Sequence, residues 1–109
     1  MSTAFDEEVT TKLKEPPKFN LWAINNDFTA FDEVVFILTR AFGMSESVAS
    51  EITFKVDREG KAKCNPKPMS RGLAEAQLAK VNEVKKQLAM SNPFRSVQIR
   101  MLTFVIKED

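Results

Sequence analysis

The chain has 109 residues, 43% of them hydrophobic, and its 16 basic and 15 acidic residues leave a net charge of +1. This length fits one domain, and the balance of charge argues against broad electrostatic capture of nucleic acid. The chain has no histidine and a single cysteine, Cys64, which excludes an intramolecular disulfide, Cys/His zinc sites and Ser-His or Cys-His nucleophile pairs. We therefore expect a protein that is not an enzyme and needs no cofactor or metal, with Cys64 as a small buried side chain.

The first residues are polar and bear on localisation. No apolar run approaches the roughly 20 residues of a membrane span. Acidic residues at positions 6–8 precede any apolar stretch, which argues against a signal peptide. We therefore expect a cytoplasmic protein with no membrane partner. Pro16 and Pro17 fix φ and remove backbone donors, so we interpret residues 1–17 as a flexible N-terminal extension and residues 18–109 as the folded domain.

A strand, a polar elbow and a helix are predicted next. Residues 18–24 alternate in a way typical of a strand. The elbow Asn25-Asn26-Asp27 follows, and Thr29 can cap a helix whose apolar positions recur at helical spacing as far as Phe42, before Gly43. The elbow therefore brings amide and carboxylate groups beside apolar surface, with Trp22 on one side and aromatic residues of the helix on the other.

The remaining pattern predicts two further helices and two further strands. The second helix begins after Ser45 and ends before Gly60, and a short strand covers residues 61–65. A third helix follows Ser70 over residues 71–90, a strand covers residues 95–106, and residues 107–109 should fray. The order predicts an α+β sandwich, in which a three-stranded antiparallel sheet packs with three helices.

Three polar features have two interpretations each. The elbow can be ordinary turn chemistry, because Asn and Asp side chains bond nearby backbone groups, or a polar cup for a cation. Asp57 can be a solvated helix end, although the helix dipole disfavours an acid there, or part of a site. The cations Lys85, Lys86, Arg95 and Arg100 can be a solvated face, or the basic patch of a small nucleic-acid-binding domain with salt-dependent binding. The near-neutral charge argues against the last, so we expect no nucleic-acid partner.

Four short blocks stand in one order along the chain and carry a family resemblance. They are Ile24-Asn25-Asn26-Asp27-Phe28-Thr29 followed by Val34-Val35, then Gly60-Lys61-Ala62-Lys63-Cys64, then Ala74-Glu75 running to Val81-Asn82, and finally Pro93-Phe94. Over roughly Pro17 to Met101 the chain resembles the ClpS family, bacterial adaptors that bring N-degron substrates to the AAA+ unfoldase ClpA or ClpC. The resemblance implies a small α/β sandwich after a mobile tail.

The resemblance also implies a binding site for the first residue of a substrate. Its α-amino group would be held by Asn25, Asn26 and Asp57, where Asn26 stands for an aspartate of the family and Asp57 for a histidine. A carboxylate and an ammonium form a charge-assisted hydrogen bond, so the charge of the site would be kept but relocated. The pocket would be lined by Asp27, Thr29, Phe31, Val34, Thr53, Val56 and Phe94. Bulky Phe31 and Phe94 would narrow it and Thr53 would enlarge its floor, so the accepted side chains are expected to differ from the family's Leu, Phe, Tyr and Trp.

The partners follow from the same resemblance. The expected ligands are N-degron peptides or proteins and the N-terminal domain of ClpA or ClpC, bound by a monomer. Glu75 and Gln77 are the candidate docking residues, and the family's acidic and lysine docking positions correspond to Gly72 and Gln77. Residues 1–17 would engage the unfoldase during delivery, the alternative being an incidental disordered terminus. The alternative function is a decoy or inhibitor that binds the unfoldase without delivering N-degron cargo.

Overall fold

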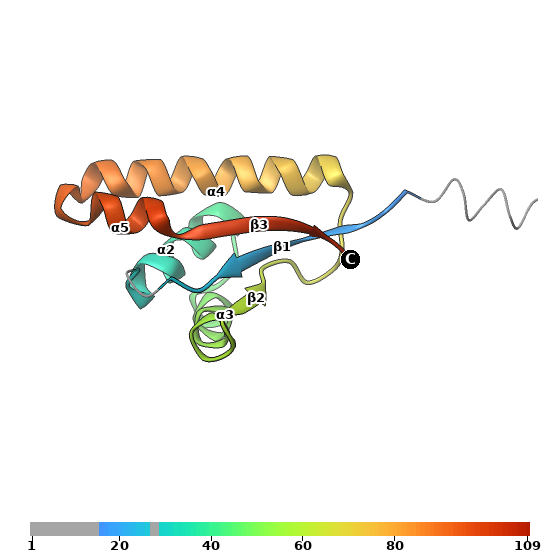
Figure 1. The fold of residues 1–109 in the computed structure, drawn as a ribbon, viewed down its shortest axis with the longest axis horizontal. Coiled ribbons are helices and arrows are strands. Elements are labelled where there is room, and N and C mark those ends of the chain that lie inside the picture. The colour runs from blue at the N-terminus through green and yellow to red at the C-terminus, as the bar shows by residue number, and fades with distance from the viewer. Residues whose placement is uncertain (1–15, 27–28) are drawn as a thin grey trace, which may run out of the picture.

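The protein folds into a three-stranded sheet with helices against it (Figure 1). The structure is a computed structural model and describes residues 16–26 and 29–109, so most of the predicted extension, residues 1–15, lies outside it. The elements in chain order are β1 (Phe19–Ile24), α2 (Phe31–Phe42), α3 (Glu46–Glu59), β2 (Lys61–Lys63), α4 (Arg71–Ser91), the 3-10 helix η1 (Pro93–Arg95), α5 (Ser96–Met101) and β3 (Thr103–Glu108).

The sheet is antiparallel with strand order β2-β1-β3, which confirms the predicted α+β sandwich. The long helix α4 packs against β1 and β3, α2 packs against α3 and α4, and α3 packs against β2. The side chains of Phe19, Leu21 and Ala23 are buried, as the alternation in β1 predicts. The largest side chains that are fully buried come from both halves of the chain: Leu21, Ile37, Leu38, Val81, Ile99 and Leu102.

Local signals at the helix ends are confirmed. The Ser45 hydroxyl accepts a hydrogen bond from the Val48 N–H and the Ser70 hydroxyl one from the Leu73 N–H, both at 3.2 Å. Gly43 and Gly60 follow the ends of α2 and α3 with φ of 68° and 87°, in the left-handed region that glycine adopts without steric cost.

The predicted cap of α2 is wrong. Ala30 is the N-cap, and its N–H donates to the Glu33 carboxylate at 2.9 Å. The Thr29 hydroxyl instead donates to the carbonyl oxygen of Gln98 at 3.2 Å. The Thr29 hydroxyl, which the local pattern predicts as the cap of α2, is therefore hydrogen-bonded to a residue distant in the sequence.

The strand predicted over residues 95–106 is wrong in its first half. There the chain forms η1 and α5, the fourth α-helix among the described residues, and only then β3. In this segment Ile99 and Leu102 are buried, a spacing of one helical turn, while Val97 is 67% exposed. Nor do residues 107–109 fray, because β3 pairs with β1 as far as Glu108 and the Asp109 N–H donates to the carbonyl of Lys18 at 2.8 Å.

Candidate functional site

A small cavity opens beside the elbow, with a volume of about 60 Å³. It lies where the end of β1, the start of α2, the C-terminal half of α3 and the start of β3 meet. Its lining residues are Asn25, Asn26, Thr29, Phe31, Val34, Thr53, Val56, Asp57 and Leu102. We call this the elbow cavity. It brings together all the residues that the sequence singled out for the binding site except Asp27, which lies outside the described residues, and Phe94.

The polar edge of the elbow cavity comes from the elbow and from the end of α3. The Asn25 N–H donates to the carbonyl oxygen of Gly60 at 2.8 Å, and the Gly60 N–H donates to that of Val56 at 2.8 Å. These two bonds fasten the elbow to the turn that follows Asp57. Asp57 is exposed and, of the lining residues within the described part of the chain, it is the only charged one. The edge thus offers one carboxylate beside two side-chain amides, a set of acceptors that suits a cationic group.

The apolar side of the cavity is packed tightly. Val34, Thr53 and Val56 are 5%, 4% and 4% exposed. The Thr53 hydroxyl donates to the carbonyl oxygen of Ala49 at 2.7 Å, so its polar group is satisfied within its own helix. Phe31 lines the cavity, and the centre of its ring lies 4.7 Å from that of Phe54, at an interplanar angle of 57°. Phe54 itself does not line the cavity and is 58% exposed on α3.

The structure places Phe94 away from the cavity and Leu102 in it. Phe94 lies on η1 and is 98% exposed, whereas Leu102 is 1% exposed and lines the cavity just before β3. The reason is the extra helix: α5 separates the turn at Pro93 from the last strand, so the apolar side chain that reaches the cavity comes later in the chain. In the sequence, the mostly apolar run from Leu102 to Ile106 is the feature that marks the start of β3.

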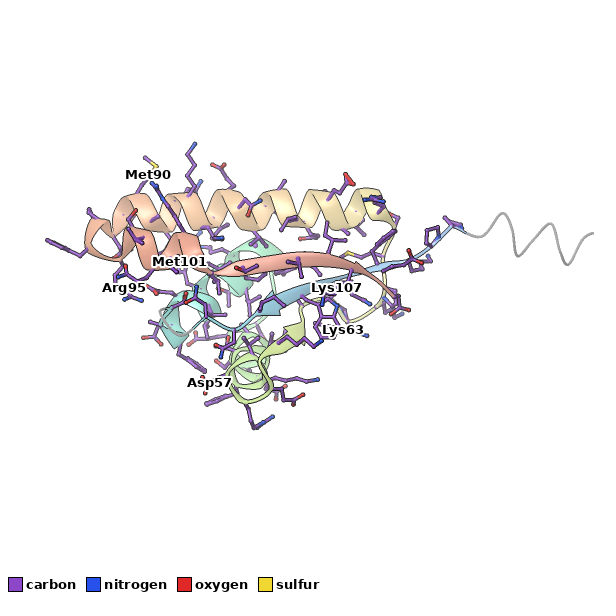
Figure 2. The ribbon with its side chains drawn as sticks, viewed as in Figure 1. Asp57, Lys63, Met90, Arg95, Met101 and Lys107 are labelled. Carbon is purple, nitrogen blue, oxygen red and sulfur yellow. The ribbon has the colours of Figure 1, made fainter. Side chains whose placement is uncertain are left out.

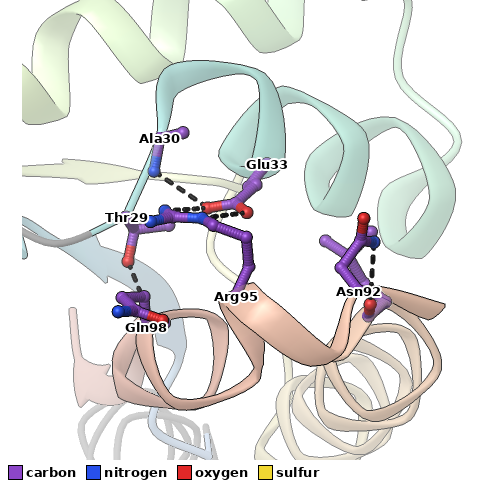
Figure 3. Close-up of polar contacts among 7 residues, drawn as sticks. Thr29, Ala30, Glu33, Asn92, Arg95 and Gln98 are labelled. Carbon is purple, nitrogen blue, oxygen red and sulfur yellow. Dashed lines mark hydrogen bonds and ion pairs between the residues drawn. The ribbon is translucent and has the colours of Figure 1, made fainter. Parts of the chain in front are cut away.

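Two contacts from η1 and α5 hold the start of α2 in place (Figure 3). Arg95 donates two hydrogen bonds to the Glu33 carboxylate, from Nη2 to Oε1 at 2.7 Å and from Nε to Oε2 at 3.0 Å. The hydrogen bonds from Arg95 lower the pKa of Glu33 below its ordinary value of 4.5. The second contact is the bond from Thr29 to Gln98 described above. Sequence inspection missed both, because each joins residues more than 60 positions apart.

Two of the four cations that could form a basic patch have partners within the protein. Arg95 is paired with Glu33, and the ammonium of Lys85 donates to the carbonyl oxygens of Arg100 and Leu102. Burial lowers the pKa of Lys85. These contacts tie α4 to the end of α5, next to the cavity. Lys86 and Arg100 are exposed, as the interpretation as a solvated face expects.

The candidate docking residues do not form one surface. Glu75 is exposed and pairs with Arg71 at 3.2 Å. Gln77 is half-buried and borders a second cavity of about 420 Å³, next to Cys64. Residues two apart on a helix point in different directions, which accounts for the separation. Cys64 is buried as expected, and burial raises its pKa to about 12.

Two kinds of feature are absent from residues 16–26 and 29–109. No group of three or more Cys, Asp or Glu side chains there is arranged to hold a metal ion. Within the same residues, none of the helices combines the length and the apolar character needed to cross a membrane.

Comparison with known proteins gives a consistent result. The model of the family described as ATP-dependent Clp protease adaptor protein ClpS matches residues 14–96. ClpS adapter proteins of Hydrogenovibrio crunogenus and Nitrosomonas eutropha are 36% and 37% identical to the chain over 81 residues, which is 74% of this chain and 76% and 77% of theirs. That of Helicobacter hepaticus is 33% identical over 85 residues, 78% of this chain and 84% of its own.

A solved structure shares the fold. It is that of Agrobacterium tumefaciens ClpS2 bound to L-phenylalaninamide, with a TM-score of 0.68 and 21% identity over 87% of this chain and 100% of that one. The family match ends at residue 96, where α5 begins, so the structure supplies the last helix and strand, which the family model does not cover. The resemblance noted in the sequence is confirmed: the chain belongs to the ClpS family of ATP-dependent Clp protease adaptor proteins.

Proposed function

We propose that the protein binds the first residue of a substrate polypeptide in the elbow cavity and delivers that substrate to a AAA+ Clp unfoldase. The observation that carries the proposal is that one cavity has both a polar edge and an apolar side. The polar edge is formed by the Asp57 carboxylate and the amides of Asn25 and Asn26. The apolar side is formed by Val34, Val56 and Leu102. A free N-terminal residue presents the matching groups, an ammonium beside a side chain. The ClpS2 structure of similar fold, bound to an amino-acid amide, supports the same use of the site.

Asp57 takes the central role in holding the ammonium. An ammonium has three donors and no acceptor, so it requires acceptors on several sides. Asp57 can supply the charged acceptor and the two asparagine side chains the neutral ones. The bond between Asn25 N–H and Gly60 O keeps both groups of acceptors at a fixed separation, independent of any ligand. Preorganisation of this kind lowers the entropic cost of binding.

The size of the cavity bears on which first residues fit. Its volume of about 60 Å³ is well below the roughly 150 Å³ of a protein cavity that admits benzene. An aromatic first residue would therefore require the cavity to widen, and movement of Phe31 would disturb its ring contact with Phe54. We expect compact aliphatic first residues to bind more tightly than Trp.

The test is fluorescence anisotropy with labelled peptides that differ only in their first residue, each made with a free or an acetylated N-terminus. Asp57→Asn keeps the shape and removes the charge, and should weaken binding of the free peptides roughly ten-fold. Asp32→Asn is the matched control, because Asp32 is exposed on α2 and does not line the cavity. Equal binding of free and acetylated peptides, or no binding of either, would contradict the proposal.

The alternative function, a decoy that occupies the unfoldase, is favoured by the separation of Glu75 and Gln77 described above. Degradation of a reporter that begins with an accepted residue distinguishes the two in a reaction with the unfoldase and its peptidase. An adaptor accelerates loss of the reporter and a decoy slows it. Repeating the reaction after removal of residues 1–15 tests whether the extension takes part in delivery.

A further inference from the structure

The sheet has a second face that α4 does not cover. Residues paired across an antiparallel ladder point to the same face. The register pairs Trp22 with Lys63 and Val105, Ile24 with Lys61, and Asn20 with Lys107. All three lysines are exposed, whereas the other face carries the buried Leu21, Ala23, Ala62 and Phe104. We call the surface formed by Trp22, Lys61, Lys63 and Lys107 the lysine–tryptophan face. Figure 2 shows Lys63 and Lys107 at the same end of the sheet.

The charges on this face are only partly compensated. The ammonium groups of Lys61 and Lys63 lie 5.2 and 5.6 Å from the centre of the Trp22 ring, within the range of cation–π attraction. Lys63 also lies 3.8 Å from Asp109, a long contact between exposed groups. Among the residues that the structure describes, no ion pair involves Lys61 or Lys107. The face thus retains a positive charge beside an aromatic surface.

The face adjoins the elbow cavity. Lys61 directly follows Gly60, whose carbonyl oxygen is bonded to the N–H of Asn25 at the polar edge of the cavity. From there the face continues along β2 to Lys63. A chain in extended conformation rises about 3.3 Å per residue, so its alternate side chains have the same spacing as the two lysines of β2. A polypeptide leaving the cavity across this face would place alternate side chains next to Lys61 and Lys63.

We propose that the lysine–tryptophan face binds acidic residues of the substrate that follow its first residue, so that the adaptor prefers N-terminal segments containing Asp or Glu at alternate positions. The inference rests on the proposed function, because a first residue held in the cavity raises the local concentration of the residues behind it. Charge complementarity identifies an anionic occupant. The adjoining cavity identifies it as polypeptide, and the net charge of only +1 provides no broad field for nucleic acid.

The experiment uses the full chain and peptides that share one aliphatic first residue. They carry Glu or Gln at alternate later positions, each with a free or acetylated N-terminus, and anisotropy is recorded at low and at high salt. At low salt the free Glu peptide should bind about three- to ten-fold more tightly than the free Gln peptide, and the difference should shrink as salt screens the exposed charges. In the double variant Lys61→Gln/Lys63→Gln the difference should vanish while the Gln peptide binds as before.

The matched control is Lys80→Gln/Lys86→Gln, which makes the same change in net charge at exposed positions of α4. It should keep the preference for Glu, and circular dichroism checks that both variants fold. Binding that depends on the free amine but not on Glu would overturn this inference and leave the proposed function standing. A preference for the Glu peptide that requires both lysines but not the free amine would support binding of acidic residues by the lysine–tryptophan face. The same result would contradict the proposed function.

Three further results would also overturn the inference. They are a preference for Glu that survives the loss of both lysines, no binding of any peptide, and lysine-dependent binding of a short oligothymidylate that is tighter than that of the Glu peptide.

Discussion

Replacement of Leu102 by alanine tests whether the segment after α5 supports both the fold and the cavity. Leu102 is 1% exposed and fills the space between the last strand and the elbow cavity. Large-to-small changes of this kind cost about 2–5 kcal/mol, depending on how far the site relaxes. Because Leu102 borders an existing opening, water can enter the vacated space, and we expect the lower part of the range, about 2–3 kcal/mol. For a domain of this size that corresponds to a loss of roughly 10–20 °C in Tm.

The assay is urea unfolding followed by the fluorescence of Trp22, the only tryptophan of the chain, with binding measured on the folded variant. Leu102→Ala enlarges the cavity, so the affinity for a peptide that begins with Trp should rise relative to one that begins with Val. Ile99→Ala is the control, since Ile99 is fully buried but does not line the cavity. It should lose comparable stability without changing the ratio of affinities. A loss below about 1 kcal/mol for Leu102→Ala, or an equal change of the ratio in both variants, would refute the reasoning.

Three further predictions concern separate features. Gly60→Ala should destabilise the protein by about 1–2 kcal/mol, because φ is 87° there. Gly72→Ala lies in the first turn of α4, where no atom is within 4 Å of the added Cβ, and should stabilise the protein by up to about 1 kcal/mol. Thermal unfolding of the two variants measures both changes in stability. Arg95→Met should raise the pKa of Glu33 toward 4.5, seen by NMR titration. Since the pKa of Glu33 is lowered in the folded state, the pair stabilises the protein fully above pH 4.5 and progressively less as the pH falls below it. The difference in free energy of unfolding between wild type and variant should therefore shrink at acid pH, and a difference that stays the same would contradict this role of the pair. Cys64, buried with a pKa of about 12, should resist a disulfide reagent in the native state and react after denaturation.

Features with a local physical cause could be predicted from the sequence. The caps at Ser45 and Ser70 and the helix ends at Gly43 and Gly60 depend on residues within one turn of the chain. The alternation in β1 correctly predicts that Phe19, Leu21 and Ala23 are buried, but it does not predict the burial of Asn20 on the opposite face, where its side chain is hydrogen-bonded to Asn65 and Asp109. The grouping of the elbow residues with those of α3 came from the family resemblance, since nothing local links positions so far apart.

What could not be predicted depends on tertiary contacts. Thr29 looked like a helix cap because its competing acceptor, the carbonyl of Gln98, is invisible in the local sequence. The segment from Arg95 to Met101 was assigned to a strand, because alternating residue types outweighed the helical spacing of its buried positions, which only packing against α4 reveals. The prediction that Phe94 lines the cavity came from the family resemblance and not from this strand, and Leu102 lines the cavity where Phe94 does not.

The position of Leu102 links occupancy of the cavity to completion of folding. The cavity is lined by residues near the start of the domain and by one that directly precedes the last strand, so it cannot exist until the chain has closed its longest-range contacts. A partly folded chain would therefore be unable to hold a ligand, and a ligand that binds only the closed form stabilises it, by about 2.7 kcal/mol at a hundred times its Kd. Under the function proposed above, cargo in this cavity would thus also protect the adaptor itself from unfolding.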